Sequence, residues 1–178
     1  MKFFHVQLAA FVAGLSSAQT LNIPTRVGSV VALASPSTIS GSVDFGNREF
    51  DRGRPCDSDD DTGSESAVFI LQNGASISNV IIGANALEGV HCLGACTLTN
   101  VWFRDVCEDA VSVLGSGNAL IVGGGAQNAK DKVIQHNGAG TVTVRTNNAF
   151  EASRRNTNPT VDSRLHRRQR RQALPLVR

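Results

Sequence analysis

A repeat of 21 to 22 residues constrains the fold of this chain more than any other feature. Four units begin with short apolar segments, at 67–71, 89–93, 110–114 and 132–136. The first three units end at acidic residues, Glu88, Asp109 and Asp131, which are 21 and 22 positions apart. Each unit continues with one or two further short alternating segments, separated by Gly or Asn. This pattern indicates strand, turn and strand rather than helix.

Repeats of about 20 to 25 residues that contain only short strands are typical of a parallel β-helix, with one coil per unit. A helical array would need a 3.6-residue apolar period, and a leucine-rich array would need regularly spaced Leu; neither pattern is found. We therefore predict an all-β fold, a single-stranded solenoid in which each coil buries its inward side chains against those of the next coil.

Stacking of the coils has a chemical consequence for the acidic residues. Equivalent positions of adjacent coils lie about 4.8 Å apart, so Glu88, Asp109 and Asp131 are expected to form a row. Glu108 should lie beside Asp109, and Lys132 at the edge of the row. Stacked carboxylates repel one another unless a cation neutralises them or their pKa values rise. Oxygen ligands on a rigid surface suit Ca²⁺, whereas the alternative is a solvated acidic edge without a metal.

The N-terminus and the cysteines indicate secretion. Residues 1–18 have a positively charged start, an apolar stretch and small residues at the end, which is typical of a secretory signal. No later apolar run reaches the length of about 20 residues that a membrane helix needs. In an oxidising compartment, the even set of four cysteines favours disulfides, with three pairings open: Cys56, Cys92, Cys96 and Cys107. A zinc site formed by His91 with Cys92, Cys96 and Cys107 is the alternative, although the spacing lacks paired CxxC motifs.

The charge divides the chain into two parts. Residues 19–145 carry 8 Lys and Arg against 13 Asp and Glu, whereas residues 146–178 carry 8 Arg against 2 acids. We expect a β-helix domain over 19–145 and a disordered Arg-rich tail over 146–178. The acidic stretch 57–61 is expected to be a solvated loop, because it lacks the register of an EF-hand.

Several sequence blocks resemble the small fungal pectate lyases of polysaccharide lyase family 3. They include EGVHC at 88–92, DVCEDA at 105–110, GGGA at 123–126 and DKVIQHNG at 131–138, and the resemblance covers roughly residues 20 to 144. It implies a right-handed parallel β-helix and a secreted enzyme that cleaves de-esterified pectin, an α-1,4-galacturonan of plant cell walls. The cleavage in that family is a Ca²⁺-dependent β-elimination that produces unsaturated oligogalacturonides.

The resemblance also implies roles for individual residues. Glu88, Glu108 and Asp109 match the carboxylates that hold Ca²⁺, and Lys132 matches an essential lysine, either the base or a substrate clamp. A lysine beside a divalent cation should have a lowered pKa, so we expect an alkaline optimum. The expected partner is polygalacturonate, without nucleic acid or membrane, and the expected state is a monomer.

Two departures from the family pattern bear on activity. Leu114 stands where the family commonly has a lysine, five residues after the second carboxylate of the pair. After Val144 the family's further coils, with an essential arginine, are not matched. The tail is a basic arm, a processing site or, as we favour, the product of a shifted frame or a mis-spliced exon. We expect weak or no lyase activity; the alternatives are an inactive pectate-binding solenoid and a polygalacturonase-like hydrolase, whose close Asp cluster the blocks do not resemble.

Overall fold

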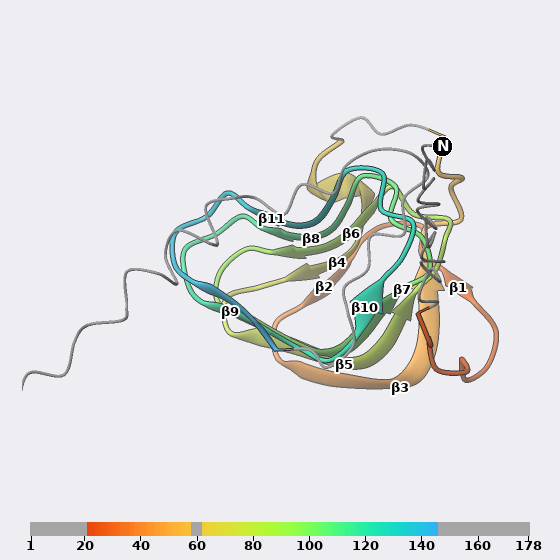
Figure 1. Cartoon of the computed structure of the whole chain (residues 1–178), viewed down its shortest axis with the longest axis horizontal. Coiled ribbons are helices and arrows are strands. Elements are labelled where there is room, and N and C mark those ends of the chain that lie inside the picture. Colours follow the sequence, from red (N-terminus) through yellow and green to blue (C-terminus); the bar gives the residue numbers. More distant parts are fainter. Residues whose placement is uncertain (1–20, 58–61, 146–178) are drawn as a thin grey trace, which may run out of the picture.

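The computed structural model describes residues 21–57 and 62–145, and strands stacked in parallel make up almost all of their regular structure (Figure 1). One sheet has the order β1-β3-β5-β7-β9-β12, with β10 paired to β7, and the other has the order β11-β8-β6-β4-β2. The first sheet contains β1 (Val31–Ala32), β3 (Ser42–Asp51), β5 (Ala75–Ile82), β7 (Cys96–Phe103), β9 (Ala119–Val122), β10 (Gly125–Ala126) and β12 (Val142–Arg145). The second contains β2 (Ser37–Ile39), β4 (Ala67–Leu71), β6 (Glu88–Cys92), β8 (Asp109–Val113) and β11 (Lys132–His136).

The chain passes back and forth between the two sheets, so that each repeat unit adds to both of them, and the consecutive strands β9 and β10 both join the first sheet (Figure 1). Every strand pair is parallel, from β1 with β3 to β12 with β9. This is the connectivity of a parallel β-helix, and the prediction from the repeat is confirmed. One short 3-10 helix, η1 (Ser64–Ser66), precedes β4. No helix within the described residues is both long and apolar enough to span a membrane.

The core consists of rows of inward side chains that run along the stack. Ile77, Leu98 and Ile121 are register partners on β5, β7 and β9, and all are almost completely buried. A second row on the other sheet contains Phe69, Val90 and Val111. Alternating apolar residues place every second side chain inside each coil, so neighbouring coils bury one another.

Asparagines in left-handed backbone conformations bend the strands at equivalent points of successive coils. Asn79 and Asn100 have φ of 49° and 52°, a region that Asn tolerates better than most residues. Their side chains form a ladder, in which Asn100 Nδ2 donates to Asn79 Oδ1 at 3.0 Å and Asn79 Nδ2 donates to Asp44 Oδ2 at 2.9 Å. Gly123, with φ 63°, continues this row, because a Cβ there would lie 2.4 Å from Asn100 Oδ1. The ladder satisfies amides at the bend and fixes the register of the coils.

All four cysteines are in disulfides, Cys56–Cys107 and Cys92–Cys96. The preference for disulfides is therefore confirmed, and the zinc alternative is wrong because no thiolate is left to bind a metal. The spacing had left three pairings open, since the pairing depends on which corners of the coils lie side by side.

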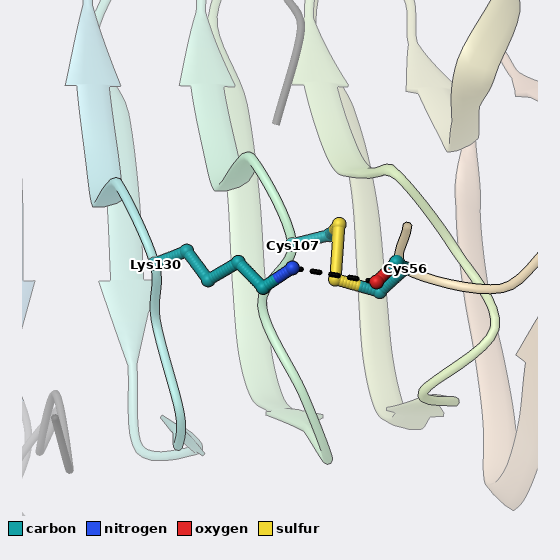
Figure 2. Close-up of a disulfide and its surroundings, with 3 residues drawn as sticks. All are labelled: Cys56, Cys107 and Lys130. Carbon is teal, nitrogen blue, oxygen red and sulfur yellow. Dashed lines mark hydrogen bonds between the residues drawn. A yellow bond between two sulfur atoms is a disulfide. The ribbon is translucent and has the colours of Figure 1, made fainter. Parts of the chain in front are cut away.

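The connection from β3 to β4 crosses the corners of three coils. The backbone N–H groups of Arg52 and Arg54 donate to Asn85 O at 3.0 and 3.2 Å. Farther along the connection, Cys56 is bonded to Cys107, and Lys130 Nζ donates to Cys56 O at 3.3 Å (Figure 2). This segment, residues 52–57, thus ties together the corners that immediately precede β6, β8 and β11. We call residues 52–57 the corner strap.

Three sequence predictions lie outside the described residues. They are the signal at 1–18, the basic tail at 146–178 and most of the acidic stretch at 57–61, of which the structure describes only Asp57. The domain boundaries derived from them stay predictions.

Candidate active site

The strands β6, β8 and β11 begin at one corner of the solenoid, and each begins with a charged side chain. Lys132 is the register partner of Asp109, and the uniform offset between β6 and β8 places Glu88 opposite Asp109. The row is therefore Glu88, Asp109 and Lys132. The expectation that Asp131 takes the third place in this row is wrong by one residue. Asp131 lies opposite Glu108 instead, as the register of β11 with β8 shows.

This difference in register brings a lysine among the carboxylates. Lys132 Nζ lies 3.5 Å from Asp109 Oδ1 and 3.9 Å from Glu108 Oε1. It also forms a hydrogen-bonded ion pair with Asp131 Oδ2. Lys132 thus forms ion pairs with three carboxylates.

Three carboxylates converge closely enough to share one cation. Single oxygen atoms of Glu108, Asp109 and Asp131 lie within 4.8 Å of one another, and we name these residues the acidic cluster. Glu108 and Asp109 are buried, while Asp131 is exposed. Asp109 Oδ1 is buried without a hydrogen-bond partner among the described residues. Asp109 Oδ1 thus has the ion pair with Lys132 but no hydrogen bond in that part of the chain, and it lies beside two further carboxylates, which fits the oxygen ligands that Ca²⁺ prefers.

Glu88 is buried at the same corner in the preceding coil, with 2% of its surface exposed. It forms a hydrogen bond with Glu108 that helps to raise the pKa of the latter. Glu88 Oε2 also lies 3.1 Å from His91 Nε2. Glu88 is thus next to the acidic cluster and reaches it through Glu108.

Glu108 and Asp109 resist ionisation because they are buried beside other carboxylates. Burial is the largest cause that raises the pKa of Glu108 to about 8, and the charges of Asp109 and Glu88 add to it. Burial likewise raises the pKa of Asp109 to about 6, although the ammonium of Lys132 opposes the rise. Lys132 compensates for part of this repulsion, and a bound cation would compensate for more of it.

For Lys132, burial lowers the pKa, but the carboxylates of Asp131, Asp109 and Glu108 outweigh it, and the pKa is raised overall. The expected fall in the pKa of Lys132 requires the charge of a cation beside the ammonium. It therefore stays a prediction.

Leu114 lies away from the acidic cluster. It directly follows the end of β8, whereas Asp109 begins that strand. Five residues of extended chain correspond to about 16 Å. A lysine at position 114 would therefore lie away from Lys132, and its absence leaves the acidic cluster unchanged.

Residues 20–155 match the family model of pectate lyase. The chain belongs to the pectate lyase family. It is 54% identical over 125 residues to pectate lyase E of Emericella nidulans, and this match covers 69% of this chain and 49% of that protein. With pectate lyase H of the same fungus it shares 49% identity over 137 residues, covering 76% of this chain and 52% of the relative.

Among solved structures, the chain is similar to the catalytic domain of pectate lyase PelI from Erwinia chrysanthemi, with a TM-score of 0.49 and 32% identity. The match covers 66% of this chain and 56% of that structure. The chain spans about half the length of the curated pectate lyases that it matches.

Within this pectate lyase family chain, the sequence predicted Glu88, Glu108, Asp109 and Lys132 as site residues, and the structure places all four at one corner. Two polar neighbours of the carboxylates were missed in this role: His91, which was considered only as a zinc ligand, and Ser112, which was not singled out. Ser112 Oγ donates to Asp109 Oδ2 at 3.2 Å. Each follows its carboxylate by three residues, a spacing that is visible in the sequence once the strand starts are known.

Proposed function

We propose that this chain is a secreted pectate lyase that cleaves de-esterified polygalacturonate by Ca²⁺-dependent β-elimination. The observation that supports this most strongly is the acidic cluster beside Lys132, in a chain of the pectate lyase family. The signal pattern of residues 1–18 and the two disulfides favour an extracellular location.

Glu88, Glu108 and Asp109 remain the proposed Ca²⁺ ligands, and we add Asp131 because its carboxylate joins those of Glu108 and Asp109. When bound, Ca²⁺ supplies positive charge that engages a galacturonate carboxylate and acidifies the proton on the adjacent C5. The protein carboxylates fix the position of that charge on rigid strand starts. Burial and then mutual repulsion raise the pKa of Glu108, and both disfavour leaving the group fully charged and uncompensated.

Lys132 is the proposed base. As the free amine, its Nζ removes the C5 proton, and the C5–H electron pair forms the double bond between C4 and C5. The bond from C4 to the glycosidic oxygen breaks, and that oxygen leaves with its electron pair and takes a proton from water. Because the neighbouring carboxylates favour the ammonium form of Lys132, we expect the rate to increase toward alkaline pH.

The test is the absorbance of unsaturated products on polygalacturonate, measured with Ca²⁺ and with a chelator. Lys132→Ala should lower kcat by at least about 100-fold, the usual contribution of a positioned base. Lys130→Ala is the matched control, since Lys130 is an exposed lysine two residues away that bonds to the corner strap. It should keep the parent rate.

A low rate still supports the proposal if chelation and Lys132→Ala both abolish it. A rate that is equal with and without chelator would overturn the Ca²⁺ dependence. Binding of polygalacturonate without any product would replace the enzyme by a binding solenoid. Size-exclusion chromatography with light scattering tests the expected monomer.

A further inference from the structure

Two coils of the solenoid repeat the same hydrogen-bond arrangement at the acidic corner. In β6, Glu88 Oε2 lies 3.1 Å from Nε2 of His91. In β8, Asp109 Oδ2 accepts a hydrogen bond of 3.2 Å from Ser112 Oγ. In both strands the carboxylate is the first residue and its partner is the fourth. His91 and Ser112 are also register partners in neighbouring strands.

We propose that His91 and Ser112 are positioning residues, which hold the carboxylates of Glu88 and Asp109 in the orientation that binds the cation. The inference rests on the proposed function, because it takes these carboxylates as Ca²⁺ ligands. Residues that orient metal ligands through hydrogen bonds typically change metal affinity by about 10- to 100-fold when they are removed.

Burial makes these hydrogen bonds effective constraints. Glu88, Asp109, His91 and Ser112 are each at most 3% exposed, so water does not replace a lost donor easily. One oxygen of each carboxylate is held by its partner. In Asp109 the other oxygen, Oδ1, has no hydrogen bond within the described residues and lies 3.5 Å from Lys132 Nζ. The donor therefore occupies one oxygen and leaves the other for a cation.

His91 is itself held by a third group. Ser64 Oγ, in η1, lies 3.0 Å from His91 Nδ1. Because a carboxylate only accepts, His91 donates from Nε2 to Glu88, and in the neutral ring Nδ1 then accepts from the Ser64 hydroxyl. Two hydrogen bonds thus link Glu88, through His91, to Ser64 in η1.

The third coil provides a natural control. Its strand β11 has Lys132 in the place of the carboxylate and Gln135 in the place of Ser112, as the register shows. Gln135 thus occupies the same row as His91 and Ser112 without a carboxylate three residues before it. If cation binding depends on the hydrogen bond between a carboxylate and its donor, rather than on polar side chains along that row, Gln135→Ala should leave cation binding unchanged.

The experiment measures Ca²⁺ affinity by isothermal titration calorimetry on the full chain, without substrate. We expect Ser112→Ala and His91→Leu each to weaken binding about tenfold, in line with the lower end of such effects. Ser112→Thr and His91→Gln, which keep a donor, should restore most of the affinity. Melting temperatures in EDTA identify any variant that fails to fold, and Ser112→Ala keeps the test intact should His91→Leu be one of them.

The outcomes separate this inference from the proposed function. If the parent chain binds no Ca²⁺, the proposed function fails and the inference fails with it. If the parent binds Ca²⁺ and Ser112→Ala and His91→Leu bind equally well, only the inference is overturned. It is also overturned if Gln135→Ala weakens binding as much as Ser112→Ala, or if Ser112→Thr and His91→Gln restore nothing.

Discussion

The inner coils and the last described coil have the same strand pattern but differ in packing. All five residues of β6 and of β8 are buried, whereas all five residues of β11 are only half-buried. The inner strands pair on both sides, while β11 ends its sheet in the described part of the chain. In the row of Ile77, Leu98 and Ile121, the last member is Val144, which is 39% exposed.

Burial in this solenoid therefore comes from the neighbouring coils more than from the sequence of a coil. The difference in burial also bears on the candidate site, which spans both environments. Glu88, Glu108 and Asp109 belong to the inner coils, and Asp131 and Lys132 belong to the last. The inner coils thus supply fixed carboxylates, and the last coil supplies the more accessible lysine.

The largest difference should come from the corner strap, which has a covalent bond to an inner coil and only a hydrogen bond to the last one (Figure 2). The Cys56–Cys107 disulfide closes a loop with a sequence separation of 51 residues. In the chain-entropy model, replacing both cysteines by Ala costs about 4 kcal/mol of unfolding free energy. Lys130→Ala should cost less than about 1 kcal/mol, because its hydrogen bond is exposed.

Urea denaturation of the two variants checks this ranking. The second disulfide is the control, since Cys92–Cys96 has a separation of only 4 residues and its removal should cost about 2 kcal/mol. Equal losses for the two disulfides would mean that loop length does not set their contribution.

A smaller difference is expected within the core row. Leu98→Ala removes a buried side chain between two neighbouring coils and should cost about 3 kcal/mol. Val144→Ala changes the exposed end of the same row and should cost less than about 1 kcal/mol. Urea midpoints of the two variants measure the difference. Similar losses would contradict the view that neighbours on both sides create the burial.

The sequence predicted the inner coils more accurately than the last one. The turns before β5 and β7 have three residues, 72–74 and 93–95, but the turn before β9 has five, 114–118. Counting from one acidic residue to the next misses this insertion, which is why Asp131 was placed in the row that Lys132 occupies. The repeat therefore predicted the coils and the strands. The register of the last coil depended on the length of the turn 114–118, which the spacing of the acidic residues does not reveal.

The disulfide pairing and the contacts of His91 illustrate a second limit. Both depend on the corner strap and η1, which join the solenoid from outside the repeat. No periodicity relates Cys56 to Cys107 or Ser64 to His91, since these contacts arise between a connection and the coils that it crosses. The site carboxylates, in contrast, belong to the repeat itself and were found from it.

A pH dependence of stability is also expected, and it belongs to the inner coils. In the folded chain the pKa of Glu108 is raised to about 8 and that of Asp109 to about 6, from ordinary values of 4.5 and 3.8. Between those limits the folded state binds more protons than the unfolded state. Without Ca²⁺, stability should therefore be greater at pH 5 and fall as the pH rises toward 8.

Melting temperatures in EDTA from pH 5 to pH 9 test this sign. Glu108→Gln should flatten the decrease, because it removes the carboxyl whose ionisation is most strongly opposed. Asp131→Asn is the matched change in the last coil, at an exposed carboxylate, and should flatten it less. A melting temperature that rises with pH across this range would mean that Glu108 ionises readily in the folded chain, and the acidic cluster would then lack the repulsion that favours a cation.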